Sequence, residues 1–81
     1  MNIGETLHDL GFKAESANDE WSIYTHVGSN YGELIMVAVN VDSGEIEVTR
    51  EPFDPEKDAP LVVRFSRFDY AIAPMLERWT K

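Results

Sequence analysis

The chain has 81 residues, no cysteine and a formal net charge of −8. This length suffices for one domain with a modest core, and a hydrophobic content of 43% argues against disorder. Without cysteine the chain has no thiol nucleophile, thiolate metal site or disulfide. The excess of acids disfavours direct binding to nucleic-acid phosphates, because such binding depends on clustered Lys and Arg.

The charge is unevenly distributed along the chain. Residues 1–60 contain thirteen acidic and three basic residues, whereas residues 61–81 contain two acidic and four basic ones. The first ten residues lack the basic segment of a secretory signal. The longest apolar run, residues 34–39, is too short to cross a bilayer. The sequence therefore predicts a cytoplasmic protein with a single domain, residues 1–81, and no membrane partner.

A short helix is predicted over residues 2–10. Asn2 and Glu5 have the spacing of a capping box. One face carries apolar residues at helical spacing: Ile3, Leu7 and Leu10. Gly11 is expected to end the helix in the left-handed conformation, with Phe12 returning onto it. A helix this short is unstable alone and must pack on another element.

An antiparallel meander of three strands is predicted next, over residues 21–27, 33–42 and 46–50. The first strand alternates, and the second is rich in β-branched residues. Residues 28–32, with glycine at each end, are expected to form a turn between them. Residues 42–45 are expected to form a compact hairpin turn with Gly44 at positive φ.

Residues 52–60 are predicted to form an acidic loop framed by prolines, which interrupt a sheet because proline donates no backbone hydrogen bond. Residues 61–65 can add a short fourth strand. Ser66 and Asp69 form a second capping pair before an amphipathic helix. Its apolar residues recur at helical spacing: Phe68, Ile72, Met75, Leu76 and Trp79. Pro74 is expected either to kink this helix or to delay its start.

The predicted fold class is α+β: an antiparallel β-meander of three to four strands, with an N-terminal and a C-terminal helix packed on one face (α-β-β-β-(β)-α). Both helices have one apolar face, which places them on the same side of the sheet. The predicted core comprises Trp21, Ile35, Val37, Val39, Val41, Ile46, Val48, Phe65, Ile72, Leu76 and Trp79. The other sheet face is predicted to display Tyr24, His26, Leu34, Met36, Ala38, Asn40, Glu47 and Thr49.

This order of elements resembles the double-stranded-RNA-binding domain in topology. The resemblance implies an architecture and not a function. Such domains contact RNA through basic loops and the N-terminal end of their last helix, whereas these strands carry acids where lysines would be needed.

Two patterns in the sequence contain some of the residues of a metal site. Asp54, Glu56 and Asp58 alternate like the first ligands of a calcium loop, but Ala59 and Phe65 occupy the positions that require glycine and glutamate. The only histidines, His8 and His26, have no second histidine or cysteine at ligand spacing. No pattern pairs carboxylates in an apolar cleft or forms a catalytic triad. We therefore expect no metal, cofactor or enzymatic activity.

The candidate binding surface combines an apolar patch on the uncovered sheet face with surrounding acids. Tyr24, Leu34 and Met36 are its expected buried centre, since apolar patches with polar rims often mark interaction surfaces. The predicted partner-binding residues are Tyr24, His26, Leu34, Met36, Glu45, Glu47, Asp54, Glu56 and Asp58.

These features favour a small acidic binding protein that engages or inhibits a basic protein partner, such as a nucleic-acid-handling protein. Two alternatives remain open. A nucleic-acid mimic would occupy a Lys/Arg groove, and small acidic phage inhibitors such as anti-CRISPR proteins resemble this chain in size and charge. A homo-oligomeric structural or chaperone-like module would instead pair the patch or an edge strand with its own copy, giving a homodimer.

Overall fold

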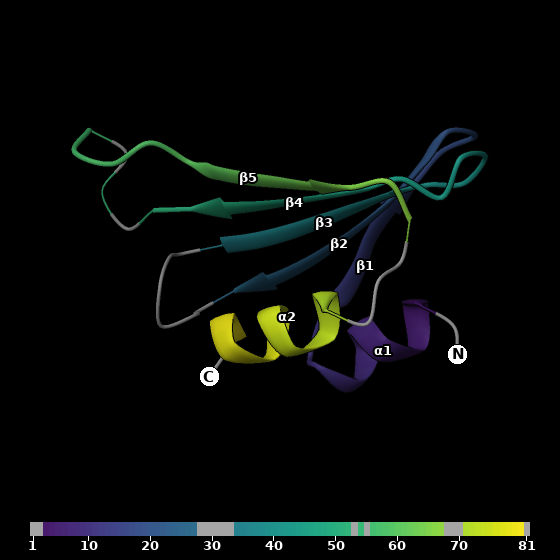
Figure 1. Cartoon of the computed structure of the whole chain (residues 1–81), viewed down its shortest axis with the longest axis horizontal. Coiled ribbons are helices and arrows are strands. Elements are labelled where there is room, and N and C mark those ends of the chain that lie inside the picture. Colours follow the sequence, from purple (N-terminus) through teal and green to yellow (C-terminus); the bar gives the residue numbers. More distant parts are fainter. Residues whose placement is uncertain (1–2, 28–33, 53, 55, 68–70, 81) are drawn as a thin grey trace.

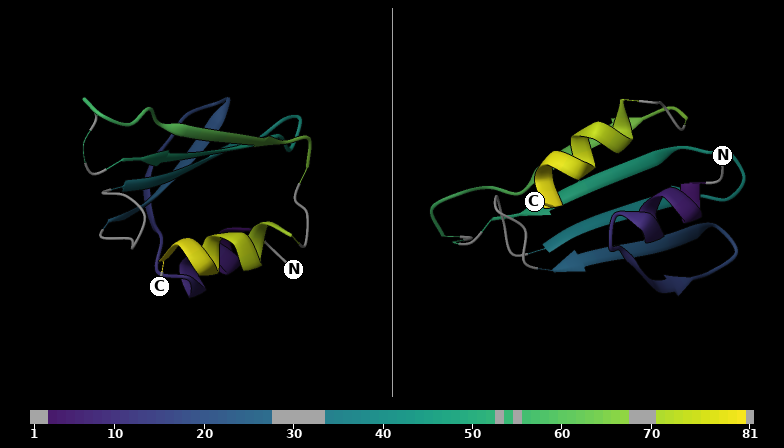
Figure 2. Two further views of the ribbon diagram at one scale, coloured as in Figure 1. Left: turned by 60° about the vertical axis from the view of Figure 1, so that its left-hand side comes forward. Right: turned by 90° about the horizontal axis from the view of Figure 1, so that it is seen from below.

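The computed structural model describes residues 3–27, 34–52, 54, 56–67 and 71–80. Its elements are, in chain order, helix α1 (Ile3–Asp9), strands β1 (Lys13–Ala17), β2 (Trp21–Val27), β3 (Leu34–Asn40), β4 (Ile46–Glu51) and β5 (Leu61–Phe65), and helix α2 (Ile72–Thr80). The strands form one antiparallel sheet in the order β1-β2-β3-β4-β5 (Figure 1). Both helices lie against the same face of this sheet, which gives a fold of two layers (Figure 2). Neither described helix is long and apolar enough to cross a membrane.

The predicted α+β class, the antiparallel meander and the placement of both helices on one face are confirmed. Residues 61–65 do form a strand, β5, which pairs with β4. The sequence prediction missed β1. The sheet therefore has five strands, one more than the three strands of the predicted meander and the possible fourth strand. The sequence of β1 lacks the alternation of apolar and polar residues that marks a half-buried strand, which agrees with the exposure of all five of its residues.

Helix α1 ends as predicted at Gly11, which has a φ of +93°. The N–H of Gly11 donates to the carbonyl of His8 at 3.0 Å, and the N–H of Phe12 donates to the carbonyl of Leu7 at 2.9 Å. This pair of bonds is the Schellman motif, and its usual apolar contact is available because Leu7 and Phe12 are both buried in the core. The predicted cap at Asn2 lies outside the described residues.

Replacing Gly11 or Gly44 by alanine should each lower the free energy of unfolding by about 1–2 kcal/mol, because both glycines have positive φ. A Cβ at Gly11 would lie 3.4 Å from Cδ2 of His26, whereas a Cβ at Gly44 would have no neighbour within 4 Å. Gly44→Ala therefore isolates the backbone cost. Urea denaturation followed by circular dichroism measures both losses, and an unchanged or higher stability of either variant would contradict the left-handed conformation there.

Asparagine side chains organise both described turns at one end of the sheet. Oδ1 of Asn18 accepts the N–H groups of Glu20 and Trp21 at 2.8 and 2.7 Å, between β1 and β2. Oδ1 of Asn40 accepts the N–H groups of Asp42 and Ser43 at 3.0 and 2.9 Å, between β3 and β4. Asparagine favours such turns because its side chain satisfies backbone donors locally. Gly44, in the second turn, has a φ of +79°, which confirms the predicted positive φ.

Helix α2 begins at Ile72, so Pro74 lies in its first turn and does not kink it. Proline is tolerated there because the first N–H groups of a helix have no partner within the helix. The predicted capping role of Ser66 was wrong, because α2 begins six residues after it. Asp69 and Phe68 lie outside the described residues, as do the turn predicted over residues 28–32 and Glu33, the first residue of the second predicted strand.

The core lies between the sheet and the two helices. Its buried hydrophobic residues are Leu7, Phe12, Ile35, Val37, Ile46, Val48, Ile72, Leu76 and Trp79, and Val39 and Phe65 are partly buried against them. Two predicted core residues lie elsewhere. Val41 is 53% exposed because it belongs to the β3–β4 turn, and Trp21 lies on the opposite face of the sheet because it pairs with Asn40.

Candidate functional site

Strand pairing assigns every sheet residue to one of two faces, because directly paired residues of neighbouring strands share a face. Val37 is fully buried under the helices and pairs with Tyr24 and Val48, so these three residues lie on the helix-covered face. The alternate residues form the opposite side, here called the open face. Its described members on β2 to β5 are Trp21, Ile23, Thr25, Val27, Leu34, Met36, Ala38, Asn40, Glu47, Thr49, Glu51, Val62 and Arg64.

Tyr24 and His26 do not lie on the open face, so the sheet face predicted for both was wrong. Tyr24 packs against the hydrophobic core. His26 pairs with Ile35, and its ring lies 5.3 Å from that of Phe12, tilted by 52°. Nδ1 of His26 is buried and has no hydrogen-bond partner among the described residues. These contacts give both side chains a packing role beneath the sheet.

The error arose because both faces of β2 carry large side chains. Trp21 and Ile23 alternate with Tyr24 and His26, and every residue from Trp21 to His26 is partly buried. Alternation then shows that a strand exists without showing which set points inward. The register with β3 decides the matter, because Tyr24 is directly opposite the buried Val37.

Five apolar residues form a continuous group on the open face, here called the open-face strip: Trp21, Ile23, Leu34, Met36 and Ala38. Cross-strand pairing makes Ile23 and Ala38 direct neighbours, and Met36 lies between them and Leu34 along β3. Each member is partly exposed to solvent. The sequence prediction placed Leu34, Met36 and Ala38 here correctly and missed Trp21 and Ile23.

Carboxylates flank the open-face strip on two sides, in β1 and along β4. Four of them, here called the rim carboxylates, are Glu15, Glu45, Glu47 and Glu51. Glu15 is the extra residue where the β1–β2 register shifts, and its Oε2 accepts the hydroxyl of Thr25 at 3.3 Å. Glu47 forms an ion pair with Arg64 on β5, with Oε2 and Nε 3.2 Å apart. The Arg64 side chain is 78% exposed, so this pair adds little stability and remains accessible to a partner.

A group of exposed acids lies at the end of the sheet where two described turns meet. The N–H of Val41 donates to the carbonyl of Glu20 at 2.9 Å, which holds the β1–β2 and β3–β4 turns side by side (Figure 1). The two turns carry exposed acids: Asp19, Glu20, Asp42 and Glu45. A positively charged surface approaching the open face from this end would be attracted before contact.

A shallow hollow of about 450 Å³ lies next to this end. It is lined by Trp21 from β2, by Glu45, Ile46 and Glu47, and by Arg64, Phe65 and Ser66. An aromatic ring beside carboxylates attracts cationic side chains, through the ring face and through direct ion pairing. The lining thus combines an aromatic ring and two carboxylates with one cation, Arg64, which pairs with Glu47.

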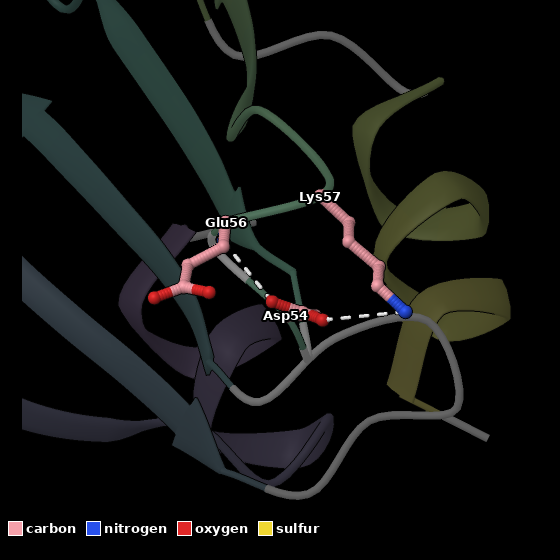
Figure 3. A network of polar contacts seen from close by, with 3 residues as sticks. All are labelled: Asp54, Glu56 and Lys57. Carbon is pink, nitrogen blue, oxygen red and sulfur yellow. Dashed lines mark hydrogen bonds and ion pairs between the residues drawn. The ribbon is translucent and has the colours of Figure 1, made fainter.

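The predicted loop residues Asp54, Glu56 and Asp58 lie at the opposite end of the sheet, between β4 and β5 (Figure 1). Asp54 Oδ1 accepts the N–H of Glu56 at 3.1 Å, and Asp54 Oδ2 lies 4.0 Å from Nζ of Lys57 (Figure 3). The Asp54 carboxylate therefore interacts with residues of its own turn. The nine predicted binding residues are distributed over the helix-covered face, the open face and this distant loop, and do not form one surface.

A second hollow, of about 650 Å³, lies between α1 and the first two strands. Its lining includes Glu5, His8, Lys13 and Tyr24. Glu5 and His8 offer two metal donors, fewer than the three protein ligands of a catalytic zinc site. In the part of the chain that the structure describes, no group of three or more His, Asp or Glu side chains is placed to hold a metal ion. The mixture of acid, base and phenol matches no single class of ligand.

Comparisons with protein-family models, with curated proteins and with solved structures gave no match. Among the described residues, the open face is the surface with the most coherent chemistry.

Proposed function

We propose that this protein is a non-catalytic binding module that docks a basic protein surface on its open face. One observation supports this most directly: the open-face strip lies on the side of the sheet that the helices leave uncovered, with carboxylates flanking it. Protein interfaces commonly have an apolar centre that contributes most of the binding energy and a polar rim that excludes water.

The charge of the chain supports a basic partner. With a net charge of −8, long-range attraction would speed the encounter with a positively charged surface. The hollow beside Trp21, Glu45 and Glu47 would then receive a lysine or arginine. Docking would cover basic residues on the partner, so a nucleic-acid-handling partner would be inhibited. The absence of cysteine is compatible with action in a reducing cytoplasm.

The apolar centre favours recognition of a protein surface over imitation of nucleic acid. A mimic would place carboxylates at the centre of its interface, where they neutralise the Lys and Arg that normally bind phosphates. On the open face the carboxylates occupy the periphery, whereas the middle is formed by Ile23, Met36 and Ala38.

Reversing the charge at the rim should abolish partner binding. The double variant Glu45→Lys/Glu47→Lys is expected to lose the basic partners that wild type recovers from cell lysate, because it removes two rim carboxylates and adds two cations. The matched control, Glu5→Lys/Asp9→Lys, changes the net charge equally but alters exposed residues of α1 in the helical layer. Equal recovery by both variants would show that the open face is not the binding surface.

Met36→Glu separates the proposed mode from nucleic-acid mimicry. This variant makes the protein more acidic but introduces a charge into the open-face strip. Docking through an apolar centre predicts weaker binding to the recovered partner, measured by isothermal titration calorimetry. Mimicry through charge alone predicts binding that is unchanged or tighter.

A further inference from the structure

We propose that β5 pairs edge to edge with β5 of a second copy of this chain, forming an antiparallel sheet that continues through both protomers. This inference is independent of the proposed function, because it concerns the edge of the sheet and the protein alone. β5 is an outer strand of the sheet order β1-β2-β3-β4-β5. Outer strands present unpaired backbone donors and acceptors, which bind another extended strand.

The hydrogen-bond alternation identifies which backbone groups of β5 point outward. The N–H of Asn40 donates to the carbonyl of Glu45 at 2.8 Å, so β4 bonds to β3 at Glu45 and at every second residue after it. The intervening residues of β4 then bond to β5, because bonded and non-bonded pairs alternate in antiparallel ladders. Their partners on β5 are Leu61, Val63 and Phe65. Consequently, the N–H and C=O groups of Val62 and Arg64 are directed away from the sheet.

The two outer strands differ in how well they are protected. β1 has a register shift between Ala14 and Ser16 and carries the charged Lys13 and Glu15. Bulges and charges are the usual means by which natural sheets prevent edge pairing. β5 pairs with β4 without a register shift and is largely apolar. Leu61 and Val62 are 41% and 47% exposed, so this edge presents apolar side chains to an incoming strand.

The sequence of β5 is complementary to itself in one antiparallel register. With the two-fold axis at Val63, Val62 of one protomer is opposite Arg64 of its partner, and these are the residues with outward backbone groups. Leu61 is then opposite Phe65, and Val63 is opposite Val63. All three of these residues lie on the helix-covered side, so the pairing would extend the hydrophobic core across the boundary.

Charge also favours a second copy at this edge. The acidic chain repels itself overall, but β5 contains no acid, and its single charge, Arg64, is paired with Glu47 of the same protomer. The two β5 strands would therefore meet without placing an acid of one strand against an acid of the other.

The proposed register and the net charge of the chain predict opposite orders of dimer affinity for two variants at Val62. Val62→Lys places a cation opposite Arg64 of the partner, whereas Val62→Glu places an anion there. The dimer dissociation constant from sedimentation equilibrium should be about tenfold higher for Val62→Lys than for Val62→Glu, because opposed charges attract and like charges repel across strands. Val62→Glu makes each protomer more acidic, so general repulsion predicts the opposite order.

Val62→Pro tests the backbone pairing itself. Proline removes an N–H that points away from β4, so the monomer fold should persist by circular dichroism while the dimer weakens by at least about tenfold. Val62→Thr is the matched control, since it keeps a β-branched residue with an N–H. A wild type that remains monomeric at all concentrations, a dimer that Val62→Pro does not weaken, or equal dissociation constants for Val62→Lys and Val62→Glu would each overturn the proposal.

Discussion

Ile35→Ala is expected to lower the free energy of unfolding by about 2–5 kcal/mol, whereas Met36→Ala should lower it by about 1 kcal/mol or less. Ile35 is fully buried beneath the helices, and truncation would leave a cavity that surrounding side chains fill only partly. Met36 is the next residue of β3, but it lies on the open face and is partly exposed. The larger loss is a substantial part of the roughly 4–12 kcal/mol typical of a chain this long.

Urea denaturation followed by far-ultraviolet circular dichroism measures both values. Because the two residues are adjacent in one strand, their comparison separates the effect of the face from the effect of the strand. Similar losses for both variants would mean that the open face is as well covered as the other side, which would remove the basis for docking there.

Trp79→Ala is expected to lower the free energy of unfolding by about 3–5 kcal/mol. Helix α2 has only nine residues and is unstable alone, so it depends on the side chains that attach it to the sheet. Trp79 is one of its three buried residues, and its ring lies 4.7 Å from the guanidinium carbon of Arg50 on β4. Alanine favours helices, so the loss would come from packing and from the cation–π contact and not from helix propensity.

Trp79→Phe is the control for this prediction. It retains an aromatic ring over Arg50 and should lose clearly less stability than Trp79→Ala in thermal and urea unfolding. Arg78→Ala, at the neighbouring exposed position, should change stability by about 1 kcal/mol or less. A loss for Trp79→Ala no larger than that for Arg78→Ala would contradict the packing of α2 through its last turn.

The elements that the sequence predicted well are those with a strong local signal. Gly11 follows an apolar helical face and has no Cβ to prevent left-handed geometry, so the end of α1 was predictable. Gly44 lies between two β-rich segments and marked the β3–β4 turn equally clearly. The alternation of Ile35, Val37 and Val39 also identified the buried side of β3 correctly, because this side is β-branched throughout, whereas the other side adds Ala38 and Asn40 to Leu34 and Met36.

Features that are decided by strand pairing, and not by the local sequence pattern, were not predictable. β1 has no large apolar side chain, only Ala14 and Ala17 among polar residues, and its pairing with β2 makes it a strand. The inward set of β2 could not be chosen from the sequence, because both sets contain large side chains. This uncertainty affected the candidate site directly, placing Tyr24 and His26 where Trp21 and Ile23 lie.

The register shift at Glu15 has a consequence for the size of any assembly. Joining two chains through their β5 strands would leave β1 as the outermost strand on both sides. There the additional residue interrupts regular pairing, and an incoming strand would find donors and acceptors out of phase. Growth should therefore stop at two copies, and light scattering should reach a constant mass with rising concentration instead of continuing toward fibrils.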